Sequence, residues 1–442
     1  RSTYIDTHIQ LSTLHLERRR NNMSVVVISK SPPVLIAPSE AIVIGEDINL
    51  SSYDKMFGGR AVTVFFIFES PIQDPMETIK RGLSQALVHY YPIAGRLAVG
   101  ATSGEFVIKC TGEGVSFVAA SANCAVKDVP DFCDSSLQEE LAVFHAAEGF
   151  SNTEPLVLMQ VTVFTCGGFV LGVMWNHAIG DGTGMAQFMQ AIGELARRLP
   201  SPSVIPVRSK NSLVLDLPPF STNFVQFLGT LQPSPMVFLD ITVSSSLVNH
   251  IKSNYMMNYK RPCSVFEAVA AVLWQCRTRA IMSDPSALVV LTFPANARKH
   301  AVAREGYYGN CVTAQLVTAS TGAVVNGDLM ELVKMIQHAK DRVSGQSEID
   351  ELRQLDGYNL FFMSCWRNLG MEAIDFGFGP PARLMEYTKV RTTLPSCATC
   401  VPCNDEYNVQ SICVIQEHAD AFIRELAKSH LTYNLLSASS KL

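Results

Sequence analysis

Residues 155–199 read PLVLMQVTVFTCGGFVLGVMWNHAIGDGTGMAQFMQAIGELARRL, and this stretch decides the fold class. Its first part, 155–176, carries no charge, but Gln160 and two threonines interrupt the run and a Cys-Gly-Gly turn lies at its centre. A helix that spans a membrane needs about 20 predominantly apolar residues, and such a turn would break it. We therefore predict two buried strands joined as a hairpin, with the second strand ending directly at His177.

A glycine-rich loop and an amphipathic helix follow this hairpin. Apolar residues recur at helical spacing after the loop, at Met185, Phe188, Ile192 and Leu195. Earlier in the chain, 61–68 has the pattern of a buried strand. The segment 74–91 then opens with an aspartate cap, a proline and a glutamate, which favours a helix. This alternation of strands and helices predicts an α/β fold.

The composition is that of a compact globular protein. The 442 residues are 48% hydrophobic and 17% charged, which is enough for a large core and favours two domains. The formal net charge is −5 and no long basic run occurs, so nucleic acid is disfavoured as a partner. The twelve cysteines are scattered, which fits free thiols in a reducing compartment. We expect no membrane partner.

We divide the chain into four parts. The first part, residues 1–22, is predicted to be a disordered leader, with a weak transit peptide as the alternative. A segment with seven prolines is predicted to be an extended crossover, poor in regular structure, between two domains. The second domain should carry helices near 263–282, 328–345 and 418–429. The parts are the leader 1–22, the N-terminal domain 23–198, the crossover 199–236 and the C-terminal domain 237–442.

Metal binding is disfavoured at both places where the sequence suggests it. Cys397, Cys400 and Cys403 have two-residue spacings, but the segment is short, no histidine flanks it and a fourth ligand is undefined. His177 and Asp181 are four residues apart, yet the glycines around them make a helical presentation of two ligands doubtful. We predict no metal.

The loop that contains His177 leaves two interpretations open. No G-x-S-x-G elbow is present, and the glycines match neither the G-x-G-x-x-G spacing nor a P-loop, so they are predicted to let the backbone pass close to another surface. His177 is then either a general base or a buried histidine bonded to the backbone. The residues alone do not decide between these two.

A family resemblance favours the base. His177-Ala178-Ile179-Gly180-Asp181-Gly182 resembles the HxxxDG motif of plant BAHD acyl-CoA-dependent acyltransferases. The sequence DFGFG at 375–379 resembles the second family signature, DFGWG. Further matches in family order are YPIAGR at 91–96, SVFEAVAAVLWQC at 264–276, NAR at 296–298 and YYGN at 307–310. The likeness extends from Met23 to the end of the chain.

The resemblance implies a fold and a mechanism. The fold is chloramphenicol-acetyltransferase-like: two similarly sized α/β domains, each a mixed sheet with flanking helices, and a solvent channel between them. Acyl-CoA is the implied co-substrate, with no metal or permanently bound cofactor, and a monomer is expected. His177 would deprotonate an alcohol or amine acceptor, which attacks the thioester directly without an acyl-enzyme.

Roles for other residues are likewise implied by the resemblance. Asp181 would point away from the channel and pair with Arg298, which holds the loop that includes Gly182. Asp375 would lie away from the chemistry, and Gly377 and Gly379 would shape a loop near the CoA side. Ser264 would contact CoA. This chain departs from the family in having Phe378 in place of tryptophan and NAR in place of D-x-R; neither position touches the proposed base.

The chain ends in Ser440-Lys441-Leu442, the peroxisomal import tripeptide, so we predict a peroxisomal location, with the cytoplasm as the alternative. Such a compartment would supply aromatic and fatty acyl thioesters. We therefore expect transfer of a benzoyl group to an alcohol such as benzyl alcohol. Hydroxycinnamoyl transfer to an alcohol or a polyamine is the close alternative, and a non-catalytic binding protein is the alternative of another class.

Overall fold

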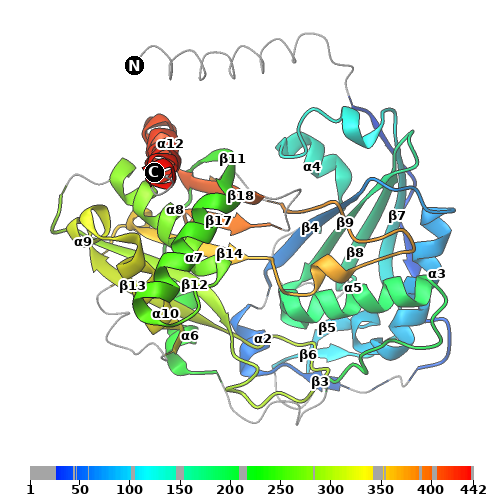
Figure 1. Cartoon of the computed structure of the whole chain (residues 1–442). Helices are drawn as coiled ribbons and strands as arrows, with labels where there is room; N and C mark the ends of the chain where they lie inside the picture. Colours follow the sequence, from blue (N-terminus) through cyan, green and yellow to red (C-terminus); the bar gives the residue numbers. More distant parts are fainter. Residues whose placement is uncertain are drawn as a thin grey trace.

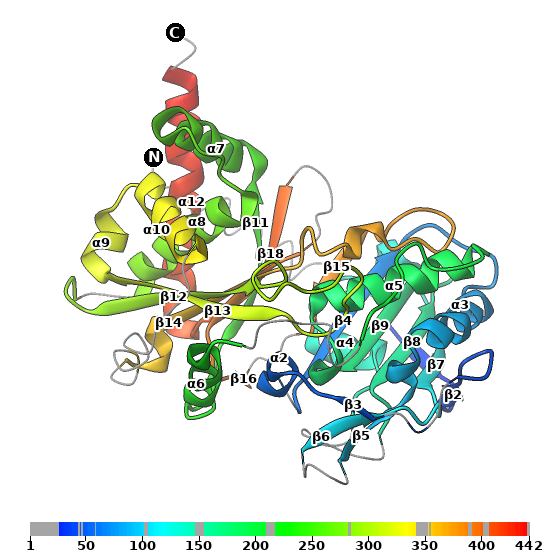
Figure 2. The same cartoon turned by 90° about the horizontal axis from the view of Figure 1, so that it is seen from below.

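The computed structural model describes most of the chain as two lobes, each built on a mixed β-sheet (Figures 1 and 2). This confirms the predicted α/β architecture with two domains. The predicted leader at 1–22 and the terminal tripeptide at 440–442 lie outside the described residues. The described residues are 26–42, 45, 47–57, 59–100, 105–145, 154–208, 217–281, 284–341, 352, 355–387, 391–400 and 406–439.

The N-terminal lobe contains a seven-stranded sheet in the order β1-β7-β8-β9-β4-β15, with β2 also paired to β7. β7 and β8 run parallel and the other pairs are antiparallel. The strands are β1 Ile28–Lys30, β2 Val34–Ile36, β4 Ala61–Phe68, β7 Val115–Ala122, β8 Val157–Val163, β9 Phe169–Asn176 and β15 Arg383–Glu386. A smaller sheet joins β3 Asp47–Asn49, β6 Phe106–Lys109 and β5 Arg96–Val99.

Alternation along these strands separates two packing layers, because successive strand residues point to opposite faces. One face packs against α3 (Pro75–His89) and α5 (Gly182–Ala196), the two helices that the apolar spacing predicts. The opposite face packs against α4 (Ser135–Leu141). The charge-free segment is the predicted hairpin, β8 and β9, and no helix among the described residues is long and apolar enough to cross a membrane.

The C-terminal lobe contains a six-stranded sheet in the order β11-β18-β17-β14-β12-β13. Its strands are β11 Val237–Ser244, β12 Leu288–Asn296, β13 Val312–Ser320, β14 Leu360–Cys365, β17 Ser396–Thr399 and β18 Glu406–Val414. The helices are α7 Ser245–Tyr259, α8 Val265–Ile281, α9 Thr321–Asn326, α10 Leu329–Asp341 and α12 Gln416–Ser439. α8 is buried at twelve successive residues, 267–278, and forms the centre of this core. The three predicted helices of this half are present.

The expectation that 199–236 lacks regular structure is wrong in part. A ten-residue helix, α6 (Pro219–Leu228), forms there with Pro218 as its N-cap. Proline is tolerated at the start of a helix because its missing N–H would have no partner in the first turn. Phe224 of this helix is buried beside Val290 and Leu316 of the C-terminal sheet. Packing against that sheet therefore stabilises a helix that the high proline content of the segment does not predict.

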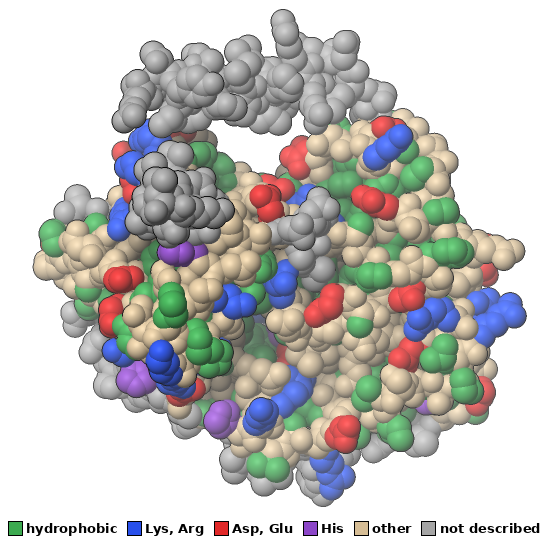
Figure 3. All heavy atoms as spheres, viewed as in Figure 1, with side chains coloured by type: hydrophobic (Ala, Val, Ile, Leu, Met, Phe, Trp, Pro, Cys, Tyr) green, Lys and Arg blue, Asp and Glu red, His purple; other side chains and the backbone are tan. Residues whose placement is uncertain are grey.

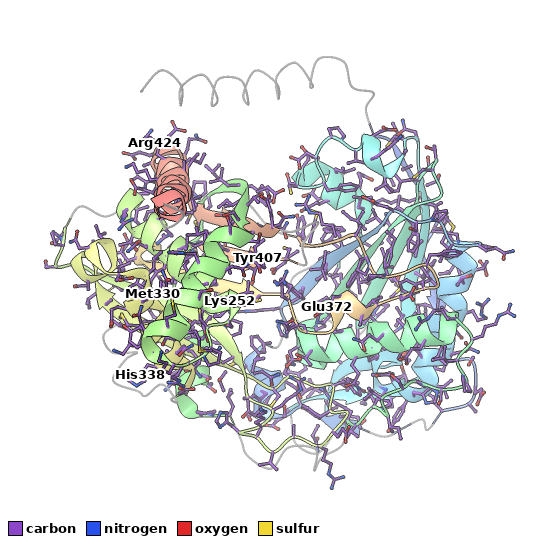
Figure 4. The ribbon with its side chains drawn as sticks, viewed as in Figure 1. Lys252, Met330, His338, Glu372, Tyr407 and Arg424 are labelled. Carbon is purple, nitrogen blue, oxygen red and sulfur yellow. The ribbon has the colours of Figure 1, made fainter. Side chains whose placement is uncertain are left out.

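Part of the C-terminal half crosses into the N-terminal lobe, which the predicted division at residue 237 does not include. β15 pairs with β4 at the edge of the N-terminal sheet. The short helix η5 (Met371–Ala373) lies beside α5, where the side-chain amide of Gln190 donates to the carbonyl of Gly370 at 2.6 Å. In Figure 4, Glu372 lies on this side of the junction, opposite Lys252 and Tyr407 of the C-terminal lobe.

The glycines after His177 allow the two lobes to approach closely, as the sequence predicts. Gly184, in the first turn of α5, lies directly against the carbonyl oxygen of Tyr308, and an added Cβ there would overlap that oxygen. Gly180 faces the same carbonyl. Because the neighbour is backbone, it cannot move aside as a flexible side chain can. Only glycine therefore fits at position 184 without displacing the backbone of Tyr308.

We predict that Gly184→Ala lowers the free energy of unfolding by about 1–3 kcal/mol, the usual cost of forcing a methyl group into a packed site. Urea denaturation of the purified protein measures this change. Gly229→Ala is the matched control, because Gly229 has an ordinary helical backbone and no atom closer than 3.2 Å to its added Cβ. Equal stability of the two variants would contradict the close approach.

Candidate active site

His177 begins a short 3-10 turn, His177–Ile179, directly after the last residue of β9. The turn starts there because the side chain of Asn176 accepts a hydrogen bond from the amide of Ala178 at 3.0 Å. The amide of His177 donates to the carbonyl of Arg60 at 2.8 Å, which ties the turn to the residue before β4. His177 is thus presented at the end of a buried strand, as the sequence indicates.

The imidazole of His177 lies in an apolar setting that keeps it neutral. The ring of Phe57 stacks on it with centroids 4.1 Å apart and planes 12° from parallel. Burial lowers the pKa of His177 below its ordinary value, and the nearby cation of Arg60 lowers it further, although Asp181 and hydrogen-bond acceptors oppose this. The ring is therefore unprotonated at neutral pH and able to accept a proton.

Asp181 is bonded to the surrounding protein rather than to the imidazole. Its carboxylate forms a two-bond ion pair with Arg298, with both N–O distances 2.9 Å. It also accepts from the amide of Gly184, as the N-cap of α5, and from the amide of Cys311. The carboxylate raises the pKa of Arg298 against the lowering effect of burial. These contacts join the His177 loop to the C-terminal lobe, and Gly182 beside them lies against Leu369.

A cavity of about 660 Å³ lies between the two lobes, next to His177. His177 itself is not among the lining residues, but its stacking partner Phe57 and its chain neighbour Asn176 are. Location at a domain junction and mostly apolar walls are typical of small-molecule sites. Aromatic rings come from both halves of the chain: Phe57, Phe144, Phe224, Phe293, Phe362 and Tyr387.

The second signature forms a loop that packs on the far end of α5. Asp375 accepts hydrogen bonds from the amides of Gly377 and Gly379 and pairs with Arg197 at 2.8 Å. Both glycines have positive φ angles, which other residues rarely adopt. The side chain of Phe378 is 68% exposed on this loop. These contacts tie the loop to α5, and none of them reaches His177 within the part of the chain that the structure describes.

Ser264 is exposed and caps α8. Its hydroxyl accepts from the amide of Glu267, and the Glu267 carboxylate accepts from the amide of Ser264, which forms a capping box. This contact explains the residue without a ligand, so the predicted contact with CoA stays a prediction. Cys397 and Cys400 are buried, and Cys403 lies outside the described residues. The described residues contain no cluster of three or more potential metal ligands.

The sequence analysis predicts no role for three polar residues at the site. Asp54, Arg208 and Asn310 are all buried, and all contact the backbone of the His177 turn or one another. Asn310 belongs to the YYGN segment, which was a family match without a role. Asp54 follows Ser51 by three residues in a capping-box pattern, which predicts the start of α2 (Ser52–Met56) but not its partners.

We predict that Asp181→Ala lowers the free energy of unfolding by about 3 kcal/mol, because the partly buried Arg298 would lose its counter-charge and the amides of Gly184 and Cys311 would lose their acceptor. Asp181→Asn should cost less, since an amide oxygen can still accept from the backbone. Thermal unfolding followed by circular dichroism measures both. Arg261→Ala is the control, because its ion pair with Asp341 is exposed and should contribute less than about 1 kcal/mol. An Asp181→Ala change no larger than this control would contradict the role.

Comparison with known proteins agrees with this geometry. A family model described as Transferase family matches residues 23–425. Acyl transferase 15 of Oryza sativa subsp. japonica is 43% identical over 435 residues, which cover 92% of this chain and 99% of that protein. A myricetin 3-O-glucosyl 1,2-rhamnoside 6'-O-caffeoyltransferase of Crocosmia x crocosmiiflora is 33% identical, over 90% of this chain and 98% of its own.

A third relative is the 3'-N-debenzoyl-2'-deoxytaxol N-benzoyltransferase of Taxus canadensis. It is 30% identical, and the match covers 84% of this chain and 88% of that protein. Among solved structures, vinorine synthase superposes with a TM-score of 0.72 at 17% identity, over 89% of this chain and 96% of that one, which shows the shared fold. The chain therefore belongs to the Transferase family of BAHD acyl-CoA-dependent acyltransferases.

Proposed function

We propose that this acyltransferase moves an aromatic acyl group from a CoA thioester to the hydroxyl group of a small-molecule acceptor, with His177 as the general base. The observation that carries the proposal is an imidazole stacked on Phe57 beside a largely apolar cavity at the junction of the lobes. No metal or other bound cofactor has a part in this chemistry. We propose that a single chain suffices, because residues of one chain supply both walls of the cavity.

The proposed reaction has three proton and bond movements. The unprotonated nitrogen of His177 removes the proton of the acceptor hydroxyl as the oxygen attacks the thioester carbonyl. A tetrahedral intermediate forms and collapses, with cleavage of the carbon–sulfur bond. The thiolate of CoA leaves and takes up the proton from the imidazolium. A base positioned in this way contributes about 10²–10⁴-fold to the rate.

The aromatic walls of the cavity support an aromatic acyl group, because rings pack well against rings. Two relatives are named for such groups, one for caffeoyl and one for benzoyl transfer. We take benzoyl as the first donor to test and benzyl alcohol as the first acceptor. Hydroxycinnamoyl transfer is the second candidate, favoured by the caffeoyltransferase at 33% identity.

The charges at the cavity support an alcohol rather than a polyamine as the acceptor. Glu386 is the single acidic residue among the described residues that line the cavity, and burial raises its pKa. Arg60 also lines the cavity and carries the opposite charge. A polyamine carries several positive charges and would need several carboxylates to replace their hydration. On the outer surface, acidic and basic side chains are interspersed on the face seen in Figure 3.

We predict measurable release of CoA thiol when benzoyl-CoA or a hydroxycinnamoyl-CoA is combined with benzyl alcohol, and little release with spermidine. His177→Ala should lower kcat by about 10²–10⁴-fold, the contribution of a general base. A panel of CoA esters and acceptors with a thiol reagent as readout tests both statements. Asp375→Asn, on the signature loop remote from the base, is the comparison variant. Unchanged turnover in His177→Ala would exclude the mechanism, and preferred turnover of spermidine would exclude the alcohol.

We further propose that the protein works in the peroxisome, on the basis of Ser440-Lys441-Leu442. The tripeptide is read by an import receptor only at a free C-terminus. A fluorescent protein fused to the N-terminus should collect in peroxisomes with the full chain and spread through the cytosol when these three residues are deleted. Diffuse fluorescence from the full-length fusion would contradict this location.

A further inference from the structure

We infer that Glu386 is a specificity-determining residue: its carboxyl group, held on the cavity wall by Trp366, binds a hydroxyl group on an aromatic ring of a substrate. The inference rests on the proposed function and narrows its substrates to hydroxylated aromatic compounds. Glu386 is the last residue of β15 and the single acidic residue among the described residues that line the cavity. It is half-buried, so a molecule in the cavity can contact it.

The backbone of Glu386 is held by both lobes. Its amide donates to the side-chain oxygen of Gln410 at 2.7 Å, and its carbonyl accepts from the side-chain nitrogen of the same residue at 3.2 Å. Gln410 is buried on β18 of the C-terminal lobe, while the pairing of β15 with β4 places Glu386 opposite Val64. Figure 2 shows β15 on the side of its lobe that faces β18. A group fixed in this way can discriminate between substrates, because sites on rigid elements are more precise than sites on loops.

The carboxyl group of Glu386 is oriented by a buried tryptophan. The indole nitrogen of Trp366 donates to Oε2 of Glu386 at 2.9 Å. The same side chain meets Trp175 edge-on, with ring centroids 6.3 Å apart and planes at 85°. It also lies against Gly182, where an added Cβ would be 3.5 Å from Cζ3 of Trp366. The carboxyl group is therefore one tryptophan ring away from the loop that contains His177.

A hydroxyl group is the partner that suits this carboxyl group in either protonation state. One oxygen accepts from the indole, and a carboxyl group has the capacity for further hydrogen bonds. A hydroxyl donates to a carboxylate and accepts from a carboxylic acid. Burial raises the pKa of Glu386, and the bond from Trp366 opposes this effect. An ammonium group would need the ionised form, which burial disfavours, so an amine is the poorer partner.

Aromatic side chains beside Glu386 favour a ring as the carrier of that hydroxyl. Phe144 and Tyr387 both line the cavity, and their ring centroids lie 4.9 Å apart with planes at 54°. The hydroxyl of Tyr387 donates at 3.2 Å to Glu139, which is exposed and is not among the lining residues. This wall therefore presents aromatic rings next to one carboxyl group. Small-molecule sites commonly combine apolar walls with a few polar groups that fix the orientation of the ligand.

The hydroxylated ring belongs either to the acyl group or to the acceptor, and the test has one arm for each. In the first arm, kcat/KM is compared for caffeoyl-CoA and cinnamoyl-CoA with benzyl alcohol as the acceptor. In the second arm, 3,4-dihydroxybenzyl alcohol and benzyl alcohol are compared with benzoyl-CoA as the donor. We expect the wild type to prefer the hydroxylated compound about 10- to 100-fold in one arm, because its absence leaves a buried polar group without that hydrogen bond. The arm that shows the preference identifies the ring that contacts Glu386.

Variants at position 386 assign the preference to the carboxyl group. Glu386→Gln should keep most of it, because an amide can accept from the indole and still form a hydrogen bond with a hydroxyl. Glu386→Met is similar in length but has no such group, so the two kcat/KM values should become equal. Trp366→Phe should weaken the preference less, because it removes only the bond that orients the carboxyl group. Glu139→Met is the matched control and should leave the preference unchanged.

The ratio of the two kcat/KM values separates recognition from a purely structural role of Glu386. If the residue served only to bond the indole, its replacement would change the turnover of hydroxylated and unsubstituted rings alike. Equal kcat/KM values in both arms of the wild type would overturn the inference. A preference that persists at full size in both Glu386→Met and Trp366→Phe would overturn it as well.

Calorimetric binding makes the result independent of the proposed reaction. Each CoA ester or alcohol is titrated alone into the protein, so that no acyl transfer occurs. A higher affinity for the hydroxylated compound that disappears in Glu386→Met supports the inference even if no pair of substrates reacts; the proposed function alone then fails. If no pair reacts and the affinities of hydroxylated and unsubstituted compounds are equal, the inference fails too.

Discussion

The structure depends on hydrogen bonds to the carbonyl groups of one short stretch of backbone at the junction of the lobes. Four successive carbonyls, from His177 to Gly180, each accept a hydrogen bond from a side chain: Asn310 for the first, Arg208 for the next two and Trp175 for the last. A buried carbonyl without a partner costs free energy comparable to a lost hydrogen bond, so this turn cannot exist in isolation. Its partners come from β9, from the crossover and from the C-terminal lobe.

This requirement explains why the two lobes form one unit. Two ion pairs lie at the turn, the buried pair Asp54–Arg208 and the partly buried pair Asp181–Arg298, and each links residues distant in the sequence. Breaking either one would leave a buried charge uncompensated. β15 comes from the C-terminal half of the chain and pairs with β4 in the N-terminal sheet, which adds a further link between the lobes. Relative motion of the lobes is thus restrained at the place where the base must stay aligned.

Sequence reasoning captured the parts of the site that depend on local pattern. The hairpin, α5 and the close approach at Gly184 follow from apolar spacing and glycine content, and the pairing of Asp181 with Arg298 follows from family motifs. The second ion pair could not be predicted in this way. Asp54 and Arg208 lie far apart in the chain. The capping-box pattern at Ser51 predicts the helix that Asp54 begins but not its ion-pair partner, and Arg208 stands in no distinctive pattern. α6 was missed because packing of Phe224 against the C-terminal sheet outweighs the local signal of the prolines.

The arrangement also explains why a histidine and an aspartate four residues apart have separate tasks. Asp181 is the N-cap of α5, and a cap must turn its carboxylate toward the first amides of its helix. That direction leads to Gly184 and Arg298, so the carboxylate is consumed in fixing the helix start. A free carboxylate on the imidazole would raise the pKa of His177 and, at neutral pH, protonate more of the base. The separation of tasks therefore lets a half-buried histidine stay neutral while its loop is held by full charges.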